Sequence, residues 1–254
     1  MQQRVGKDFP LIVKVSGHDA NLMPFPRGNT IHDAVQIARW CEEAGVHAIH
    51  VSTGNMFPHP LNPAGPLPGD TAKFAYQSMI GSGKWTFRNY LMFRHALGRK
   101  IIDWFWQRPQ DFNVDGRIDP TKLERLAADD ARAIKQAVRI PVLVTGGFQT
   151  SAGIGAVLRS GAADAVTMAR TLLANPNLPR ELAEGWSGPL NSPCSYCNRC
   201  LINVLEHPLG CYDEARYEER GGREAMLREL FEIVEDYHEE SPVALAAPAR
   251  RKVS

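Results

Sequence analysis

Residues 141–176 constrain the fold most, because they contain two consecutive βα units with a pair of glycines in the first loop. Residues 142–144 are an apolar run of the kind that fills a strand buried on both faces. Thr150 or Ser151 can cap the helix that follows. Residues 163–168 are a second apolar run. A strand, a crossover helix and a second strand in this order predict a parallel α/β sheet.

The loops after these two strands predict an anion site. The carboxyl ends of neighbouring parallel strands meet at one edge of a sheet, so the amides near Gly146, Gly147 and Ala169 would converge there. The guanidinium of Arg170 would join them. Barrel enzymes often bind a phosphate after their seventh and eighth strands. The alternative interpretation is that the glycines make only a tight turn and that Arg170 is a surface charge.

Two more strands precede this stretch. Residues 11–17 form a β-rich run, residues 30–45 carry the cap and the apolar face of a helix, and residues 46–52 form the next strand. A long helix over residues 120–138 leads into the paired glycines. Each connection is long enough for a right-handed crossover. We therefore predict an α/β protein of the TIM-barrel type that contains about four βα units, half of a barrel.

Lys14 and two histidines lie on the first two predicted strands. Lys14 is near a carboxyl end among apolar neighbours, so we expect its ammonium to face a polar partner in the site. An edge lysine that reaches water is the alternative. His47 and His50 are three residues apart and so point to opposite faces of a strand. We interpret both as ordinary histidines with polar partners.

Residues 55–118 interrupt the βα pattern as an insert. The proline-rich residues 57–66 are a candidate lid or substrate loop. Residues 71–106 are rich in aromatic side chains, which would pack over the barrel mouth or form a wall for an aromatic substrate. The GSGK run at residues 81–84 lacks the flanking residues of a nucleotide-binding P-loop.

Four cysteines follow the pattern C-x2-C-x2-C-x10-C. They are Cys194, Cys197, Cys200 and Cys211. Three cysteines within seven residues are hard to explain by packing, so we predict one metal centre of zinc or a [4Fe-4S] cluster. The alternative is that they are scattered buried thiols.

Composition and patterning suggest three regions and exclude some partners. Residues 1–190 are the half-barrel, residues 191–240 hold the cysteine cluster and a helix expected to dock on the barrel, and residues 241–254 are a tail expected to be disordered. The 29 basic and 28 acidic residues nearly balance, so no net field attracts nucleic acid or an anionic membrane. No apolar stretch reaches the length of a membrane span. We predict a cytoplasmic protein that acts on a small molecule.

The chain resembles the Old Yellow Enzyme family, and more narrowly the NADH:flavin oxidoreductases related to 2,4-dienoyl-CoA reductase. The resemblance covers roughly residues 9–217 and matches the fifth to eighth strands of that family's FMN-binding barrel. It rests on VKVS at residues 13–16, TGG at 145–147, ARTLLANP at 169–176 and CSYCNRCL at 194–201.

The resemblance implies roles for individual residues. Lys14 would lie against the pyrimidine edge of the flavin, and Gly146, Gly147 and Arg170 would hold the FMN phosphate. Ala169 stands where the family usually has glycine. In the dienoyl-CoA reductase relatives a similar cysteine run ligates a [4Fe-4S] cluster, although the second gap in this chain looks one residue shorter.

We therefore predict an FMN-dependent oxidoreductase that takes hydride from NADH or NADPH and passes it to an activated alkene or a similar small acceptor. The alternatives are a noncatalytic truncated half-barrel and a metal-binding structural or assembly partner. In the resembled family the other half of the barrel supplies the proton donor, so no catalytic residue can be named here. We expect little activity from this chain alone, and either a homo-oligomer or a missing N-terminal half-barrel as its partner.

Overall fold

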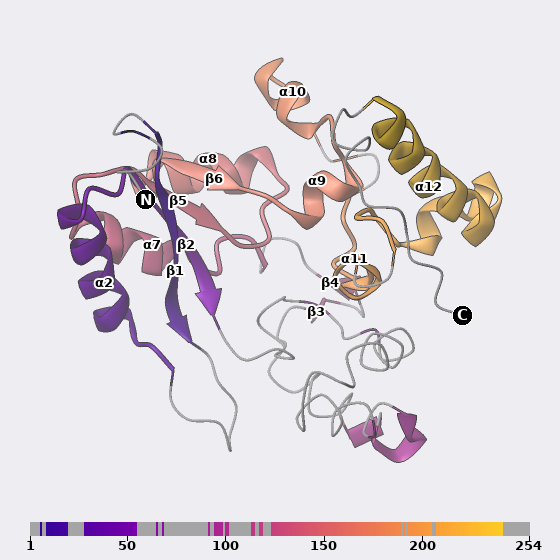
Figure 1. The fold of residues 1–254 in the computed structure, drawn as a ribbon, viewed down its shortest axis with the longest axis horizontal. Coiled ribbons are helices and arrows are strands. Elements are labelled where there is room, and N and C mark those ends of the chain that lie inside the picture. Colours follow the sequence, from indigo (N-terminus) through magenta and orange to yellow (C-terminus); the bar gives the residue numbers. More distant parts are fainter. Residues whose placement is uncertain are drawn as a thin grey trace.

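The computed structural model describes residues 6, 9–19, 28–54, 65, 68, 91, 94–98, 100–101, 113–114, 117–118, 123–188, 190, 193–204 and 207–240. Within them four parallel strands form one sheet in the order β1-β2-β5-β6 (Figure 1). The strands are β1 (Ile12–Asp19), β2 (Ala48–Gly54), β5 (Val142–Thr145) and β6 (Ala165–Thr167). The strands follow one another in the sheet in the order in which they occur in the chain. Right-handed crossovers therefore place all the connecting helices on the same face of the sheet. The prediction of four parallel strands is confirmed.

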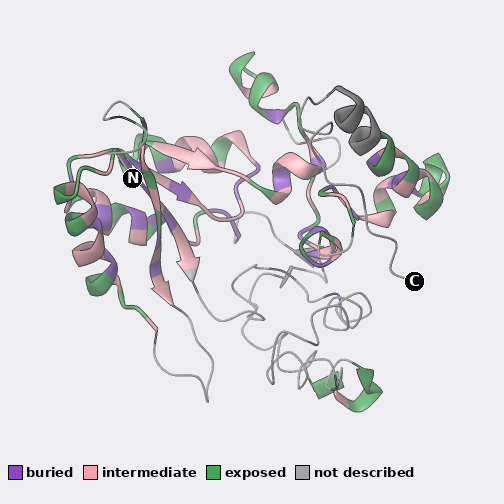
Figure 2. Ribbon diagram, viewed as in Figure 1, coloured by how far each residue is buried: buried purple, intermediate pink, exposed green. Residues whose placement is uncertain are grey.

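Three helices pack on one face of this sheet and form the main core (Figure 2). They are α2 (Ile31–Glu43), α7 (Ala128–Lys135) and α8 (Ser151–Arg159). Because side chains alternate along a strand, Val15, Val51 and Val144 share the helix-covered face and are buried. The opposite face carries Lys14 and His50, which are paired across β1 and β2. In a closed barrel that second face is the interior.

The helix boundaries follow their capping residues. Thr30 and Asp33 form the predicted capping box at the start of α2, and Thr150 caps α8 by accepting a hydrogen bond from the Gly153 amide at 3.0 Å. The helix predicted over residues 120–138 differs, because α7 begins only at Ala128. Residues 124–127 are a turn, in which Arg125 has a left-handed φ of +73°. This turn packs beside the loop after β5, because a Cβ atom added to Gly146 would lie 3.7 Å from the Ala127 backbone nitrogen.

The C-terminal part consists of short helices and one long one. The short helices are α9 (Arg170–Ala174), α10 (Leu178–Ala183), α11 (Arg199–Asn203) and the 3-10 helix η2 (Glu214–Arg220). The long helix is α12 (Gly222–Glu240), the element expected to dock on the barrel. Its Met226 and Leu230 instead join a separate cluster with Cys200, Tyr212 and Tyr217. This cluster, against which Leu173 of α9 also packs, is separate from the core under the sheet.

Most of the predicted insert lies outside the described residues. Its described parts include an antiparallel pair, β3 (Asn113–Val114) and β4 (Arg117–Ile118). The proposed lid over residues 57–66 and the tail over residues 241–254 also fall largely outside the described residues. Among the helices that are described, each is too short or too polar to cross a membrane.

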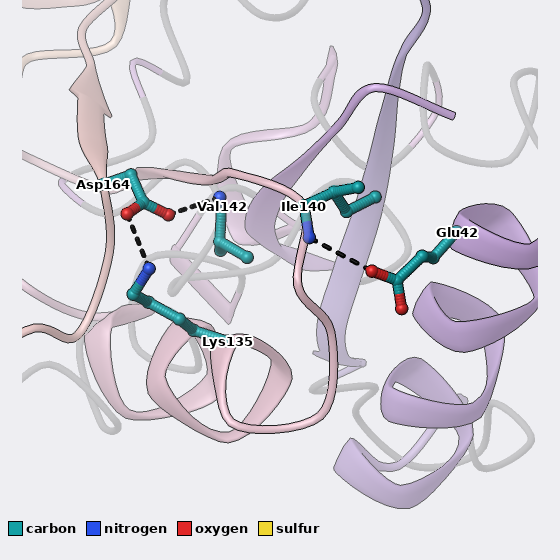
Figure 3. Close-up of polar contacts among 5 residues, drawn as sticks. All are labelled: Glu42, Lys135, Ile140, Val142 and Asp164. Carbon is teal, nitrogen blue, oxygen red and sulfur yellow. Dashed lines mark hydrogen bonds and ion pairs between the residues drawn. The ribbon is translucent and has the colours of Figure 1, made fainter. Parts of the chain in front are cut away.

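Two carboxylates hold the amino end of β5 (Figure 3). Glu42 of α2 accepts hydrogen bonds from the amides of Arg139 and Ile140, at 2.7 and 3.2 Å. Asp164 accepts one from the Val142 amide at 2.8 Å and pairs with Lys135 of α7 at 2.5 Å. These contacts lie at the edge of the sheet opposite the strand ends that carry the paired glycines. They serve the stability of the fold.

The Asp164 contacts predict a pH-dependent contribution to stability. The hydrogen bond from Lys135, and after it the one from the Val142 amide, lowers the pKa of Asp164. The ionised form therefore stabilises the fold at pH values above about 4, and this is lost as the pH falls through the lowered pKa. Because the Asp164 side chain is 41% exposed, we expect Asp164→Asn to lower the free energy of unfolding at pH 7 by about 1 kcal/mol or less.

Urea unfolding of both proteins at pH 7 and pH 3 measures this effect. The difference between Asp164→Asn and the parent should shrink at pH 3, and Glu43→Gln, which changes an exposed carboxylate near the same edge, should show little difference at either pH. A loss of equal size at both pH values would contradict the assignment to the ionised carboxylate.

Candidate functional site

A cavity of about 260 Å³ lies at the carboxyl edge of the sheet. Its walls come from Lys14 of β1, from the carboxyl ends of β2, β5 and β6, from the loops that follow β5 and β6, and from the cysteine segment, residues 193–204. The five residues predicted to bind the cofactor all line it: Lys14, Gly146, Gly147, Ala169 and Arg170. Parallel α/β proteins and barrel enzymes bind their ligands at this edge. The structure thus brings together residues that are up to 156 positions apart in the sequence, from Lys14 to Arg170.

Lys14 and His50 are neighbours on the inner face of the sheet. His50 Nε2 and Thr167 Oγ1 are hydrogen-bonded at 2.7 Å. Burial, and after it the charge of Lys14, lowers the pKa of His50. His50 is therefore neutral at pH 7, and Lys14 brings the positive charge to this part of the site. His47 also has a polar partner, since its Nδ1 accepts a hydrogen bond from the Leu11 amide at 2.9 Å.

The loop after β5 depends on glycine. Gly146 and Gly147 have φ values of +149° and +67°, in the region that favours glycine. A Cβ atom added to Gly147 would lie 2.5 Å from the carbonyl oxygen of Leu123. The turn before α7 therefore packs directly under this loop. Any side chain at position 147 would push the two segments apart.

Sequence reasoning missed Glu124, a carboxylate that is only 5% exposed. Its Oε1 accepts hydrogen bonds from the amides of Gln149 and Thr150 at 2.7 and 2.5 Å, and its Oε2 accepts one from the Thr150 hydroxyl at 2.7 Å. The protein's own carboxylate thus occupies the amino end of α8, where the helix dipole favours an anion. An external anion would have to bind nearer Gly146, Gly147 and the start of α9.

Arg170 is the first residue of α9 and contacts the cysteine segment. Its Nη1 donates a hydrogen bond to Asn198 Oδ1 at 2.5 Å, and its guanidinium carbon lies 5.2 Å from the ring centroid of Tyr196. The Tyr196 hydroxyl donates to the Gly147 carbonyl oxygen at 2.6 Å. Tyr196 and Asn198 both lie between the predicted metal ligands in the sequence. The cysteine spacing did not predict that these two residues contact Arg170 and Gly147.

The four cysteines of the predicted centre lie within electrostatic reach of one another. Burial raises the pKa of Cys200 to about 12, and it also raises the pKa values of Cys194 and Cys211. A negative charge on one thiol opposes ionisation of the others, and the charge of Arg170 favours ionisation of Cys194 and Cys200. Cys194, Cys200 and Cys211 are therefore protonated at neutral pH when no cation is bound.

The four cysteines have the donor atoms of a metal centre but not its arrangement. Four thiolates suit zinc or an iron–sulfur cluster. In the described part of the chain, however, no group of three or more His, Cys, Asp or Glu side chains is arranged to hold a metal ion. Metal binding by the cysteines stays a prediction.

Comparison with known proteins identifies the family and the fold. Residues 110–251, more than half of the chain, match the family profile "Dihydrouridine synthase (Dus)". A metal reductase of Desulforamulus reducens is 28% identical over 229 residues, which cover 89% of this chain and 25% of that protein. An NADH oxidase of Thermoanaerobacter brockii is 24% identical over 230 residues, which cover 85% of this chain and 26% of that protein.

A solved structure of 2-naphthoyl-CoA reductase in complex with 2-naphthoyl-CoA is also similar. It matches with a TM-score of 0.50 and 17% identity, over 80% of this chain and 22% of that chain. This chain spans about a quarter of the length of the curated relatives that it matches. The predicted α/β fold of the TIM-barrel type is confirmed. The chain belongs to the dihydrouridine synthase family.

Proposed function

We propose that this chain binds FMN in the cavity at the carboxyl edge of the sheet and serves an oxidoreductase that uses NADH or NADPH. The observation that carries the proposal is the lining of one cavity by Lys14, Gly146, Gly147, Ala169 and Arg170. Membership of the dihydrouridine synthase family and the similarity to an NADH oxidase support the general class of oxidoreductase.

The chemistry of these residues suits the two ends of FMN. Backbone amides near Gly146, Gly147 and Ala169, together with the guanidinium of Arg170, are donors that phosphate prefers. The ammonium of Lys14, beside a neutral His50, suits the flavin edge on which negative charge gathers. A volume of about 260 Å³ is just below the range of roughly 300 to 1,000 Å³ usual for ligand sites. The described residues would thus form one part of the cofactor site.

We propose an activated alkene or a similar small molecule as the electron acceptor. FMN, when bound, would supply the hydride transfer between the reduced nicotinamide and that acceptor. The resemblance to Old Yellow Enzyme and 2,4-dienoyl-CoA reductase supports this narrower activity. Lys14 and Arg170 would hold the cofactor and balance its negative charge, and we assign no proton donor in this chain.

Flavin content tests the proposal directly. We expect the purified chain to retain flavin, or to bind added FMN in an equimolar ratio, as measured by flavin absorbance and fluorescence titration. A chain that binds no FMN at concentrations well above micromolar would overturn the proposal.

The cysteine cluster leads to a separate prediction. We expect Cys194, Cys197, Cys200 and Cys211 to bind one metal centre, so that protein prepared without oxygen contains iron and sulfide, or else zinc. Serine at any of these four positions should lower the metal content. Cys41→Ser, a control in α2, should leave it unchanged, because Cys41 packs against the core under the sheet. Finding four titratable thiols and no metal would rule out the centre.

The open edges of the sheet favour a second proposal, in which the chain acts as one half of a barrel. In the described residues β1 pairs only with β2, and β6 pairs only with β5. A barrel closes only when its last strand pairs with its first. Another copy of this chain, or an N-terminal half-barrel, would complete the sheet and the cofactor site.

A further inference from the structure

Two side chains of the cysteine segment contact the groups proposed to hold phosphate. Tyr196 is 1% exposed, and its hydroxyl donates to the Gly147 carbonyl oxygen at 2.6 Å. Asn198 is 3% exposed, and its Oδ1 accepts a hydrogen bond from Arg170 at 2.5 Å. The guanidinium of Arg170 also lies within cation–π distance of the Tyr196 ring. One short segment thus contacts both the glycine loop and the arginine of the cavity.

The backbone of this segment is held in an uncommon conformation. Tyr196 and Asn198 have left-handed φ values of +55° and +60°. Asparagine tolerates this region, but a bulky residue such as tyrosine enters it rarely and only where its surroundings hold it there. Gln149 supplies part of that support, because its Oε1 accepts from the Cys194 amide at 3.0 Å and its Nε2 donates to the Cys194 carbonyl oxygen at 3.4 Å. The loop after β5 and the cysteine segment therefore hold each other.

We propose that Tyr196 and Asn198 are positioning residues for the phosphate of FMN, an inference that rests on the proposed function. Tyr196 fixes the orientation of the Gly147 carbonyl and supports the guanidinium of Arg170 with its ring. Asn198 holds one edge of that guanidinium, which keeps Arg170 at the cavity wall. Fixing both groups before the ligand arrives lowers the cost of ordering them on binding.

This role predicts an effect that is specific for the phosphate. Riboflavin has the same ring and sugar chain as FMN but no phosphate, so it does not depend on Gly147 or Arg170 in this way. Loss of a positioning residue should weaken FMN binding and leave riboflavin binding nearly unchanged. A side chain that only stabilises the fold would affect both ligands equally.

The experiment compares the full chain with Tyr196→Phe and Asn198→Gly by fluorescence titration with FMN and with riboflavin. Glycine at position 198 removes the acceptor but keeps the left-handed backbone. We expect the Kd for FMN to rise about fivefold to tenfold in each variant, and the Kd for riboflavin to change less than about twofold. Asn198→Asp should raise the Kd for FMN further, because its carboxylate competes with phosphate for Arg170.

Tyr212→Phe is the matched control. Tyr212 is 2% exposed, and its hydroxyl donates to the Pro208 carbonyl oxygen at 2.6 Å, so the substitution removes the same kind of bond from a buried tyrosine. It should leave the Kd for FMN unchanged, with thermal unfolding measured for every variant. FMN binding that is unaltered in Tyr196→Phe and Asn198→Gly, or lost equally with riboflavin binding, overturns this inference alone. A parent chain that binds no FMN overturns the proposed function and this inference with it.

Discussion

Arg170→Ala is expected to weaken FMN binding by about tenfold to a hundredfold. A hydrogen bond between charged partners contributes about 1.5 to 3 kcal/mol, which corresponds to that range in Kd. The guanidinium lines the cavity beside the paired glycines and is held there by Asn198 and Tyr196. Fluorescence titration of the variant and the parent with FMN measures the change. Arg170→Lys should recover part of the affinity, because it keeps the charge but loses the planar pair of donors.

Arg139→Ala is the control for this prediction. The side chain of Arg139 is 96% exposed. Arg139 precedes β5 in the chain and so lies at the edge of the sheet opposite the cavity. We expect the Arg139→Ala variant to bind FMN with the same Kd as the parent. If Arg170→Ala retains the affinity of the parent, Arg170 is not a phosphate ligand.

Residues 1–254 alone are expected to turn over NADH with a conjugated enone very slowly or not at all. The inner face of the sheet carries Ile12, which is 57% exposed, and Lys14, which is also exposed. Among the described residues, β1 and β6 each have one edge without a neighbouring strand. Unpaired edges and an exposed barrel interior favour association with another chain. The groups that complete the flavin site would come from that partner.

Steady-state kinetics and light scattering of the same sample test this prediction together. We expect a mass above that of the monomer, and Ile12→Lys should lower it, because a charge on the inner face disfavours edge pairing and burial. The matched control is Leu158→Lys, which places the same charge on α8 at a side chain that is 39% exposed. A monomer that turns over at about 1 per second or faster would contradict the half-barrel proposal.

The local elements of this fold could be predicted because their signals are local. Apolar runs such as residues 142–144 and 163–168 indicate buried parallel strands, and the caps at Thr30 and Thr150 set where two helices begin. The paired glycines marked the loop of the cavity for the same reason, since both have the positive φ values that glycine adopts most readily. These features depend on residues a few positions apart, which the sequence displays directly.

The tertiary structure decided what surrounds that loop. Glu124 fills the amino end of α8 from 25 positions away, and it lies in a turn that precedes the start of α7 at Ala128. Tyr196 reaches Gly147 from 49 positions away, out of a motif whose spacing pointed only to metal. A side chain's partner across the fold depends on how whole elements pack, and no periodicity or capping rule encodes it. The sequence by itself therefore determined the four parallel strands, the two caps and five of the residues that line the cavity, whereas packing alone decided which side chains hold them in place.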